Sequence, residues 1–209
     1  LMLRAFFSLF LLLLSAANVV SQDLIPANPF GFVMNQPERW FSIGKEEIAA
    51  GLKRLEMSEG SLDRFLEQNQ GKHLLFGYVR YKPDSFNGMN PKIEARVLKL
   101  KTTEPVTFRA FKPAAEAALR KIAKEFSEQK YIVEPSEIRI GDVASVYHIS
   151  EFSTTTQSGT KHRVRSRTYM IPRDTYFFQV SFVDEPAVND LSAEFERLVK
   201  SIKLTELKK

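Results

Sequence analysis

Three consecutive strand-like segments in the second half of the chain constrain its fold more than any other feature. They run over residues 140–157, 160–171 and 175–183. All three are rich in Val, Ile, Thr, Tyr and Phe, which suit a pleated and half-buried surface. Ser158-Gly159 and Pro172-Arg173-Asp174 separate them, and these are typical turn residues. The pattern predicts three antiparallel strands joined by two tight turns.

The third segment carries apolar side chains on both of its faces. Because side chains alternate along a strand, one face receives Tyr176, Phe178, Val180 and Phe182. The other face receives Phe177 and Val183. We therefore expect this strand to be covered on both sides.

The first hairpin gathers four basic residues on one face. If Ser158-Gly159 is a two-residue turn, Gln157 pairs with Thr160, and this fixes the register of the two strands. The basic face then also holds Thr154 and Thr156 of the first strand. The four residues, which we call the basic strip, are Lys161, Arg163, Arg165 and Arg167.

Two interpretations of the basic strip stay open. Like charges two residues apart on a strand are separated by about 6.5–7 Å, so they repel unless they are solvated or paired. One hypothesis is that the strip binds an anionic partner, such as a lipid phosphate, a polyanionic glycan or an acidic protein surface, with threonine hydroxyls as further donors. The other is that it is a solvated face or a protected sheet edge, which is the more common outcome for runs of charge.

The rest of the chain supplies helices and further strands. Apolar periodicity and capping residues predict helices over residues 42–57, 61–68, 112–129 and 189–202. Alternation predicts strands over residues 30–34, 73–81 and 92–102, and residues 131–140 lead into the three strands described above. We expect Trp40 to anchor the core rather than to stack on a ligand, since large aromatic side chains mostly pack. The tail to Lys209 is polar, and we expect it to fray.

Residues 1–22 have the features of a secretory signal peptide. Arg4 precedes an apolar run over residues 5–14, and small residues follow, with cleavage expected after Ala17 or Ser21. The alternative is an uncleaved membrane anchor, but the apolar run is shorter than the roughly 20 residues that a span needs. We therefore predict an exported protein, periplasmic or secreted, with no integral span after cleavage.

Composition limits the remaining possibilities. The chain has 209 residues and is 44% hydrophobic, which suits one globular domain over residues 23–209. It contains no cysteine, which excludes disulfides, a thiolate nucleophile, a cysteine-ligated metal and a lipoprotein anchor. The formal net charge of +5 permits an acidic partner or anionic lipid, and we expect no nucleic acid partner.

The loop over residues 82–91 is a second candidate contact. It is dense in turn-forming residues, and we expect its Phe86 and Met89 to be exposed. A partner protein could bind these apolar side chains. The alternative is a plain hairpin connection, which is the more frequent role of such loops.

The order of these parts resembles the PsbP-like group, which also includes the Ran-binding nuclear import protein Mog and periplasmic DcrB-type proteins. The resemblance covers about Phe30 to Leu204 and rests on four segments. They are Pro37–Trp40, Arg139–Ala144, Thr168–Val183 and Phe195–Ile202. It implies an α+β fold, a single-domain α/β/α sandwich around a mainly antiparallel sheet of six to seven strands.

The same resemblance bears on function, because members of the group are mostly non-enzymatic accessory or binding proteins and several are exported. The surfaces that bind Ran or the photosystem have no matching motif in this sequence, so they are not carried over. The signal peptide also argues against both of those roles.

No constellation in the sequence indicates catalysis. The three histidines, His73, His148 and His162, have no metal-ligand spacing, and the predicted register places His148 and His162 on opposite faces. The sequence has neither a Gly-x-Ser-x-Gly turn nor a glycine-rich phosphate loop. We therefore expect no metal and no cofactor.

These observations favour an exported, non-enzymatic accessory protein of the cell envelope that binds a protein or anionic partner. The basic strip and the loop over residues 82–91 are its expected contacts. One alternative is a periplasmic hydrolase with an unrecognised site. The other is a peripheral membrane protein held by an uncleaved amino-terminal helix.

Overall fold

The computed structural model describes residues 30–46, 48–50, 62–82, 85–86, 88–155 and 159–205. The predicted signal peptide and residues 51–57 of the first predicted helix lie outside the described residues. The elements in chain order are β1 (Phe32–Val33), β2 (Phe41–Ile43), α2 (Leu62–Gln68), β3 (Lys72–Val79), β4 (Lys92–Lys99), α3 (Phe108–Ala123), β5 (Ser127–Ile140), β6 (Val143–Thr155), β7 (Lys161–Arg173), β8 (Tyr176–Asp184), α4 (Ser192–Lys200) and β9 (Lys203–Leu204).

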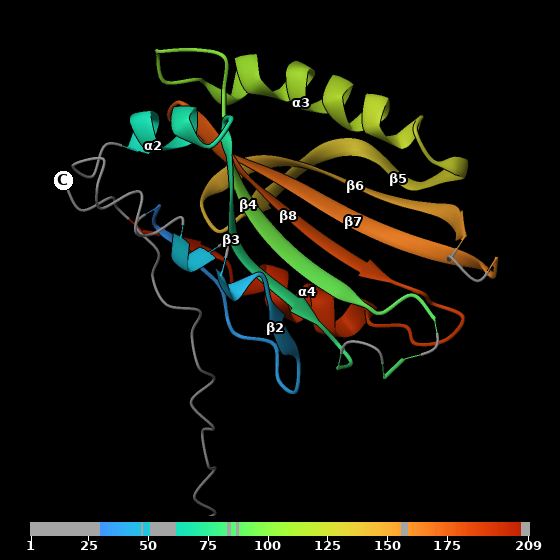
Figure 1. Ribbon diagram of the computed structural model, residues 1–209. Coiled ribbons are helices and arrows are strands. Elements are labelled where there is room, and N and C mark those ends of the chain that lie inside the picture. The colour runs from blue at the N-terminus through green and yellow to red at the C-terminus, as the bar shows by residue number, and fades with distance from the viewer. Residues whose placement is uncertain are drawn as a thin grey trace, which may run out of the picture.

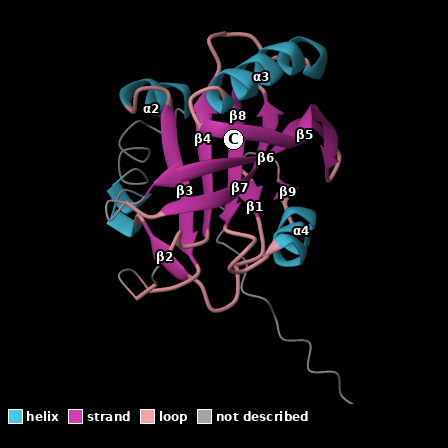
Figure 2. Ribbon diagram, turned by 90° about the vertical axis from the view of Figure 1, so that its right-hand side faces the viewer, coloured by secondary structure: helices cyan, strands magenta, loops and turns pink. Residues whose placement is uncertain are grey.

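The described chain is built around one antiparallel sheet of seven strands. The strand order is β2-β3-β4-β8-β7-β6-β5, and β1 pairs with β9 in a separate two-stranded sheet. Helix α3 lies across one face of the large sheet and α4 lies on the opposite face (Figure 1). Figure 2 shows the same two helices on either side of the strands. The predicted α+β class, with helices on both faces of a seven-stranded sheet, is confirmed.

The central strand β8 contributes to two hydrophobic cores, as its alternation predicted. Its residues Tyr176, Phe178, Val180 and Phe182 lie in the larger core, which also contains Phe195 of α4. On the other face Phe177 packs beneath α3, and the rings of Phe111 and Phe177 are 5.7 Å apart. Both faces of β8 are therefore covered.

The register of the first hairpin differs from the prediction by one residue. Thr155 pairs with Lys161 and Phe152 pairs with Val164, whereas a turn at Ser158-Gly159 alone would pair Phe152 with Arg165. The observed register places Phe152 and Val164 together in the interior. Since a slip of one residue moves every side chain to the other face, burial of this apolar pair explains the choice of register.

This slip changes the neighbours of the basic strip. Thr154 pairs with His162 instead of Arg163, and Thr156 lies outside the described residues. Arg165 is instead paired with Glu151. His148 and His162 now share one face, so the prediction of opposite faces was wrong.

Several element boundaries also differ. Helix α3 begins at Phe108 rather than at residue 112, because Thr107 accepts a hydrogen bond from the backbone N–H of Ala110 and so caps the helix. It ends at Ala123, and Ser127 starts the long strand β5. The predicted helix over residues 42–57 begins later, since Ser42 lies in β2 and pairs with Tyr78 of β3.

The last elements close the fold. Helix α4 begins at Ser192 rather than residue 189, and the expected fraying of the tail is wrong for Lys203–Leu204, which form β9. Phe32 pairs with Leu204, so β9 holds the first described strand. Trp40 is buried against Phe195, as predicted, with ring centroids 6.1 Å apart.

Candidate functional site

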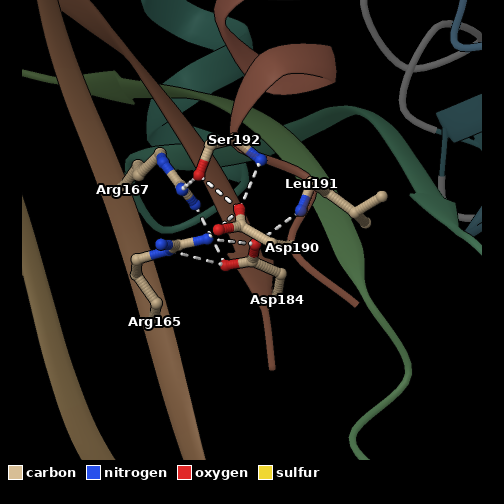
Figure 3. A network of polar contacts seen from close by, with 6 residues as sticks. All are labelled: Arg165, Arg167, Asp184, Asp190, Leu191 and Ser192. Carbon is tan, nitrogen blue, oxygen red and sulfur yellow. Dashed lines mark hydrogen bonds and ion pairs between the residues drawn. The ribbon is translucent and has the colours of Figure 1, made fainter. Parts of the chain in front are cut away.

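Half of the basic strip lies inside a network of polar contacts at the start of α4. Arg165 of β7 places its Nη2 atom 2.8 Å from Oδ2 of Asp184, and Nη1 of Arg167 is 3.0 Å from Oδ1 of the same carboxylate. Arg165 also pairs with Asp190, and Arg167 donates to the Ser192 hydroxyl at 2.6 Å. Figure 3 shows the two guanidinium groups pointing toward this acidic pair.

Burial shows that this network is structural. Asp184 has no exposed surface and Arg167 is 4% exposed, so neither reaches solvent on a scale that a partner could use. The Arg167 guanidinium lies 5.2 Å from the centre of the Phe195 ring. Asp184 also accepts the backbone N–H of Leu191 at 3.0 Å. The network therefore ties β7 and β8 to the first turn of α4.

Asp190 is the second carboxylate of this network. Its carboxylate accepts the Ser192 hydroxyl and the Ser192 backbone N–H. These hydrogen bonds, together with the one from Arg165, hold the pKa of Asp190 well below its usual range. Leu191 is the residue before α4, and Asp190, one position earlier, accepts the backbone N–H of Ser192 at the start of the helix.

The other half of the basic strip lies nearer the surface and is also paired. Lys161 forms an ion pair with Glu128 at 2.5 Å, and the Lys161 side chain is 58% exposed. Nε of Arg163 lies 3.5 Å from Glu151, and Nη1 of Arg163 donates to the backbone carbonyl of Glu128. Each cation of the basic strip thus has an acidic partner within the chain. The strip as a whole offers an incoming anion little uncompensated charge.

The loop over residues 82–91 is more closely packed than predicted. The expectation that Phe86 and Met89 are exposed was wrong, since both are half-buried. Phe86 stacks on Tyr81 with ring centroids 4.2 Å apart, which removes its face from water. The backbone N–H of Met89 lies 3.4 Å from the Glu185 carboxylate. Binding of a partner by this loop remains a prediction.

The histidines occupy three separate environments. His73 is buried beside Phe65, with the two rings 5.1 Å apart. Burial of His148 lowers its pKa to about 4 and keeps it neutral, and its Nδ1 atom has no hydrogen-bond partner in the described structure. Nδ1 of His162 lies 3.0 Å from Glu185, a contact that the sequence analysis missed. Among the described residues, no group of three His, Asp or Glu side chains could hold a metal ion.

Three arginines from distant parts of the chain line one cavity at the Pro37–Trp40 turn. The cavity has a volume of about 360 Å³, and its ionisable lining residues are Glu38, Arg39, Arg80, Glu194 and Arg197. We call it the arginine pocket. The turn contributes Arg39, β3 is followed by Arg80, and α4 contributes Glu194 and Arg197. Three guanidinium groups face two carboxylates, so the pocket is positively charged.

One wall of the arginine pocket is held rigidly. The Trp40 indole N–H donates to Oε1 of Glu194 at 2.7 Å. The Arg80 guanidinium lies 5.7 Å from the centre of the Trp40 ring and donates to the carbonyl of Glu38 at 3.1 Å. It is also 3.8 Å from Glu194. Arg80 is thus fixed by three contacts before any partner arrives.

The other two arginines of the pocket, Arg39 and Arg197, have no acidic partner among the described residues. Within the described part of the chain, neither Arg39 nor Arg197 forms an ion pair, and both are exposed. Arg39 has φ 60°, a left-handed conformation that is uncommon for residues other than glycine. Such conformations are enriched at functional sites, where the surrounding structure maintains them. Sequence analysis could not find this pocket, because no spacing pattern links its three arginines.

No protein-family model matches the sequence, and no curated protein matches it. Several solved structures align with the chain at low sequence identity. One, from Bacteroides thetaiotaomicron VPI-5482, aligns with 84% of this chain at 16% identity and a TM-score of 0.44, and the alignment spans 46% of that protein. PA94 of Pseudomonas aeruginosa, a protein of unknown function, aligns with 60% of this chain and 90% of its own at 12% identity and a TM-score of 0.42.

A third similar structure is LpqN, which is involved in cell envelope biogenesis of Mycobacterium tuberculosis. It aligns with 65% of this chain and 79% of its own length, at 14% identity and a TM-score of 0.42. Separately, none of the helices among the described residues combines the length and the apolar character needed to cross a membrane.

Proposed function

We propose that this chain is an exported, non-enzymatic accessory protein of the cell envelope, PsbP-like in kind, that binds an acidic protein through its arginine pocket. The observation that carries the proposal is the convergence of Arg39, Arg80 and Arg197 on one cavity. The proposal keeps the anionic partner expected from the sequence but moves its contact away from the basic strip, whose cations are already paired.

The geometry of the pocket suits a carboxylate. A guanidinium group is planar and offers two parallel N–H donors, which match the two oxygens of an Asp or Glu side chain. Arg80 is already oriented by the Trp40 ring and the Glu38 carbonyl, so little side-chain freedom is lost when a partner binds. Arg39 and Arg197 form no ion pair with any described residue and are exposed, so their charges are available to steer an acidic partner.

Export is supported by the sequence alone. Arg4 followed by the apolar residues 5–14 has the order of a signal peptide. The absence of cysteine is compatible with export, because a domain of this size does not need disulfides. A binding role is favoured over a catalytic one because the densest polar cluster, around Asp184, is satisfied by its own members and holds α4 in place.

The test is affinity capture from envelope extract with two variants matched in charge. Arg39→Asn with Arg197→Gln removes two cations from the arginine pocket, and asparagine tolerates the left-handed conformation at residue 39. Lys161→Gln with Arg163→Gln removes two cations from the basic strip. Circular dichroism and urea unfolding confirm that both variants are folded.

We expect the parent protein to capture an acidic protein that is lost as the salt concentration rises. Capture should fall about tenfold or more with the pocket variant, since two charge-assisted contacts are removed, and stay within about twofold with the strip variant. Equal capture by parent and pocket variant would refute the proposal. Loss of capture with the strip variant alone would show that the partner binds to the basic strip instead.

A further inference from the structure

The arginine pocket contains a carboxylate that opposes the binding of an anion. Glu194 of α4 lines the cavity together with Arg39, Arg80 and Arg197. Its Oε1 atom accepts the Trp40 indole N–H at 2.7 Å and lies 3.8 Å from Nη1 of Arg80. A site that needed only positive charge would be served better by a neutral side chain at this position. The carboxylate therefore requires an explanation.

A structural role of Glu194 explains the side chain but not its charge. Glutamate in the first turn of a helix is favoured by the helix dipole, and Glu194 is the acidic residue of that turn in α4. The Trp40 indole N–H needs an acceptor because the residue is only 7% exposed. The neutral amide oxygen of a glutamine accepts the same kind of hydrogen bond. The contact with Trp40 therefore does not depend on a negative charge.

The Glu194 carboxylate is held in a fixed position beside the pocket. Rotation away from an incoming anion would leave the buried indole N–H of Trp40 without its partner, which is unfavourable. The Glu194 side chain is 19% exposed, whereas Glu38, the other carboxylate of the lining, is exposed. Because partial burial reduces screening by water, Glu194 repels an anion in the pocket more strongly than Glu38 does.

The charge balance of the lining matches an anion of single charge. Its ionisable residues are three arginines and two glutamates, which leave a net charge of +1. A carboxylate brings one negative charge and neutralises the lining. A phosphate monoester brings about two negative charges above its second pKa of about 6, so it would leave an excess negative charge beside Glu194.

We propose that Glu194 makes the arginine pocket selective for a carboxylate side chain over a phosphorylated residue. This inference rests on the proposed function, because it names which acidic group of a partner the pocket accepts. Arg39 and Arg197 attract the carboxylate, and Arg80 is held in place for it by the Trp40 ring. Glu194 limits the negative charge that the pocket accepts.

The test uses the single tryptophan of the chain as a reporter. Trp40 is hydrogen-bonded to Glu194 and its ring lies under the Arg80 guanidinium, so an anion in the pocket should change its fluorescence. The probes are three short peptides with blocked ends and no aromatic residue, which differ at one position. That position is glutamate, phosphoserine or glutamine. Fluorescence titrations at low salt and pH 8, where the phosphate carries two charges, give the affinity for each peptide.

We expect the parent protein to bind the glutamate peptide at least about threefold more tightly than the phosphoserine peptide, because only the carboxylate matches the charge of the lining. The glutamine peptide, which has no charge, should not bind detectably. Both affinities should fall as the salt concentration rises.

The variant Glu194→Gln should strengthen binding of both anionic peptides by unequal amounts. Removal of one repulsive charge should raise the affinity for the glutamate peptide about threefold, as for other partly exposed charge pairs. The gain for the phosphoserine peptide should be about the square of that, roughly tenfold, because the repulsion is proportional to the charge of the ligand. The preference for the carboxylate should therefore disappear or reverse.

Two control variants separate the position of the charge from its removal. Glu196→Gln removes the same charge from α4 at an exposed position outside the lining of the pocket, so both affinities should stay within about twofold. Arg39→Asn with Arg197→Gln should abolish binding of both anionic peptides. Urea unfolding shows whether each variant is folded.

The outcomes distinguish failure of this inference from failure of the proposed function. If the parent protein binds neither anionic peptide, the pocket attracts no anion and both fail together. If both peptides bind and Glu194→Gln changes the two affinities by the same factor, the selectivity does not come from Glu194 and only this inference is refuted. Tighter binding of the phosphoserine peptide by the parent protein would refute it as well.

Discussion

Asp184 accepts hydrogen bonds from Arg165, from Arg167 and from the backbone N–H of Leu191, while none of its own surface is exposed. A buried carboxylate is tolerated only when hydrogen bonds and opposite charges satisfy it. Two of these partners belong to β7 and the third precedes α4, so a single side chain at the end of β8 connects two strands to a helix.

Replacement of Asp184 should therefore be severe. Asp184→Asn leaves Arg165 and Arg167 without their shared carboxylate, and we expect a loss of about 3–5 kcal/mol in the free energy of unfolding. The measurement is urea unfolding followed by circular dichroism. Glu151→Gln, which removes a longer and partly exposed pair with Arg163, should change the stability by no more than about 1 kcal/mol. Equal losses in the two variants would contradict the role given to Asp184.

His148 should make stability depend on pH. Its pKa is about 4 in the folded chain and about 6.5 in the unfolded chain, so below pH 6.5 only the unfolded chain takes up the proton. The stabilisation is fully present above pH 6.5 and is lost as the pH falls toward 4, by up to about 3 kcal/mol.

Urea unfolding between pH 7.5 and pH 4 measures this effect. The variant His148→Phe has no imidazole, so its stability should fall less steeply than that of the parent protein over the same interval. Parallel curves for the two proteins would show that other groups cause the acid sensitivity.

At the scale of elements, helix α3 depends on a cap that precedes it. Thr107→Ala removes the acceptor for the Ala110 N–H and should lower the free energy of unfolding by about 1 kcal/mol. Thermal unfolding followed by circular dichroism provides the measurement. Thr103→Ala, at an exposed position ahead of the helix, is the control and should be close to neutral. If Thr107→Ala leaves the free energy of unfolding unchanged, Thr107 does not cap the start of α3.

Strands were easier to predict than their pairing. A strand that is buried on both faces needs apolar side chains on both. The local sequence therefore predicts β8, whose residues Tyr176, Phe178 and Val180 form one of its two apolar faces. The register of β6 and β7 depends on burial of Phe152 with Val164, which a turn rule applied at Ser158-Gly159 does not include. Local signals therefore predicted the elements, and packing decided their alignment.

The candidate sites could not be predicted for a related reason. The basic strip looked unpaired because most of its acidic partners lie outside the hairpin of β6 and β7; they are Glu128, Asp184 and Asp190. The arginine pocket combines a turn, the end of a strand and a helix, and only the folded chain brings them together.

At the scale of the whole molecule, the pairing of β1 with β9 joins the two ends of the described fold. The backbone N–H of Thr205 donates to the carbonyl of Gly31 at 2.8 Å. Gly31 has φ 71°, and a Cβ atom there would lie 2.5 Å from the Thr205 carbonyl oxygen. This close approach requires glycine at residue 31.

Two glycine substitutions separate this contact from backbone strain alone. Gly31→Ala should lower the free energy of unfolding by about 2–4 kcal/mol, since strain and a clash act together. Gly159→Ala has a similar positive φ of 84°, but no described atom lies within 4 Å of the added Cβ, so we expect a loss of about 1 kcal/mol. Chemical unfolding measures the free energy of unfolding of both variants. Equal losses would show that the close approach to the Thr205 carbonyl does not contribute to the effect at residue 31.

The bond between Gly31 and Thr205 brings residues from opposite ends of the described fold within hydrogen-bond distance. A chain whose fold closes on itself in this way is suited to circular permutation. A short peptide could join residue 205 to residue 30, and new ends could be opened beside Gly159, where no described atom lies within 4 Å of an added Cβ. This change would leave all seven strands of the sheet in place. The order in which the elements follow one another along this chain is therefore separable from their arrangement in space, and the arginine pocket would keep its lining residues in such a rearranged chain.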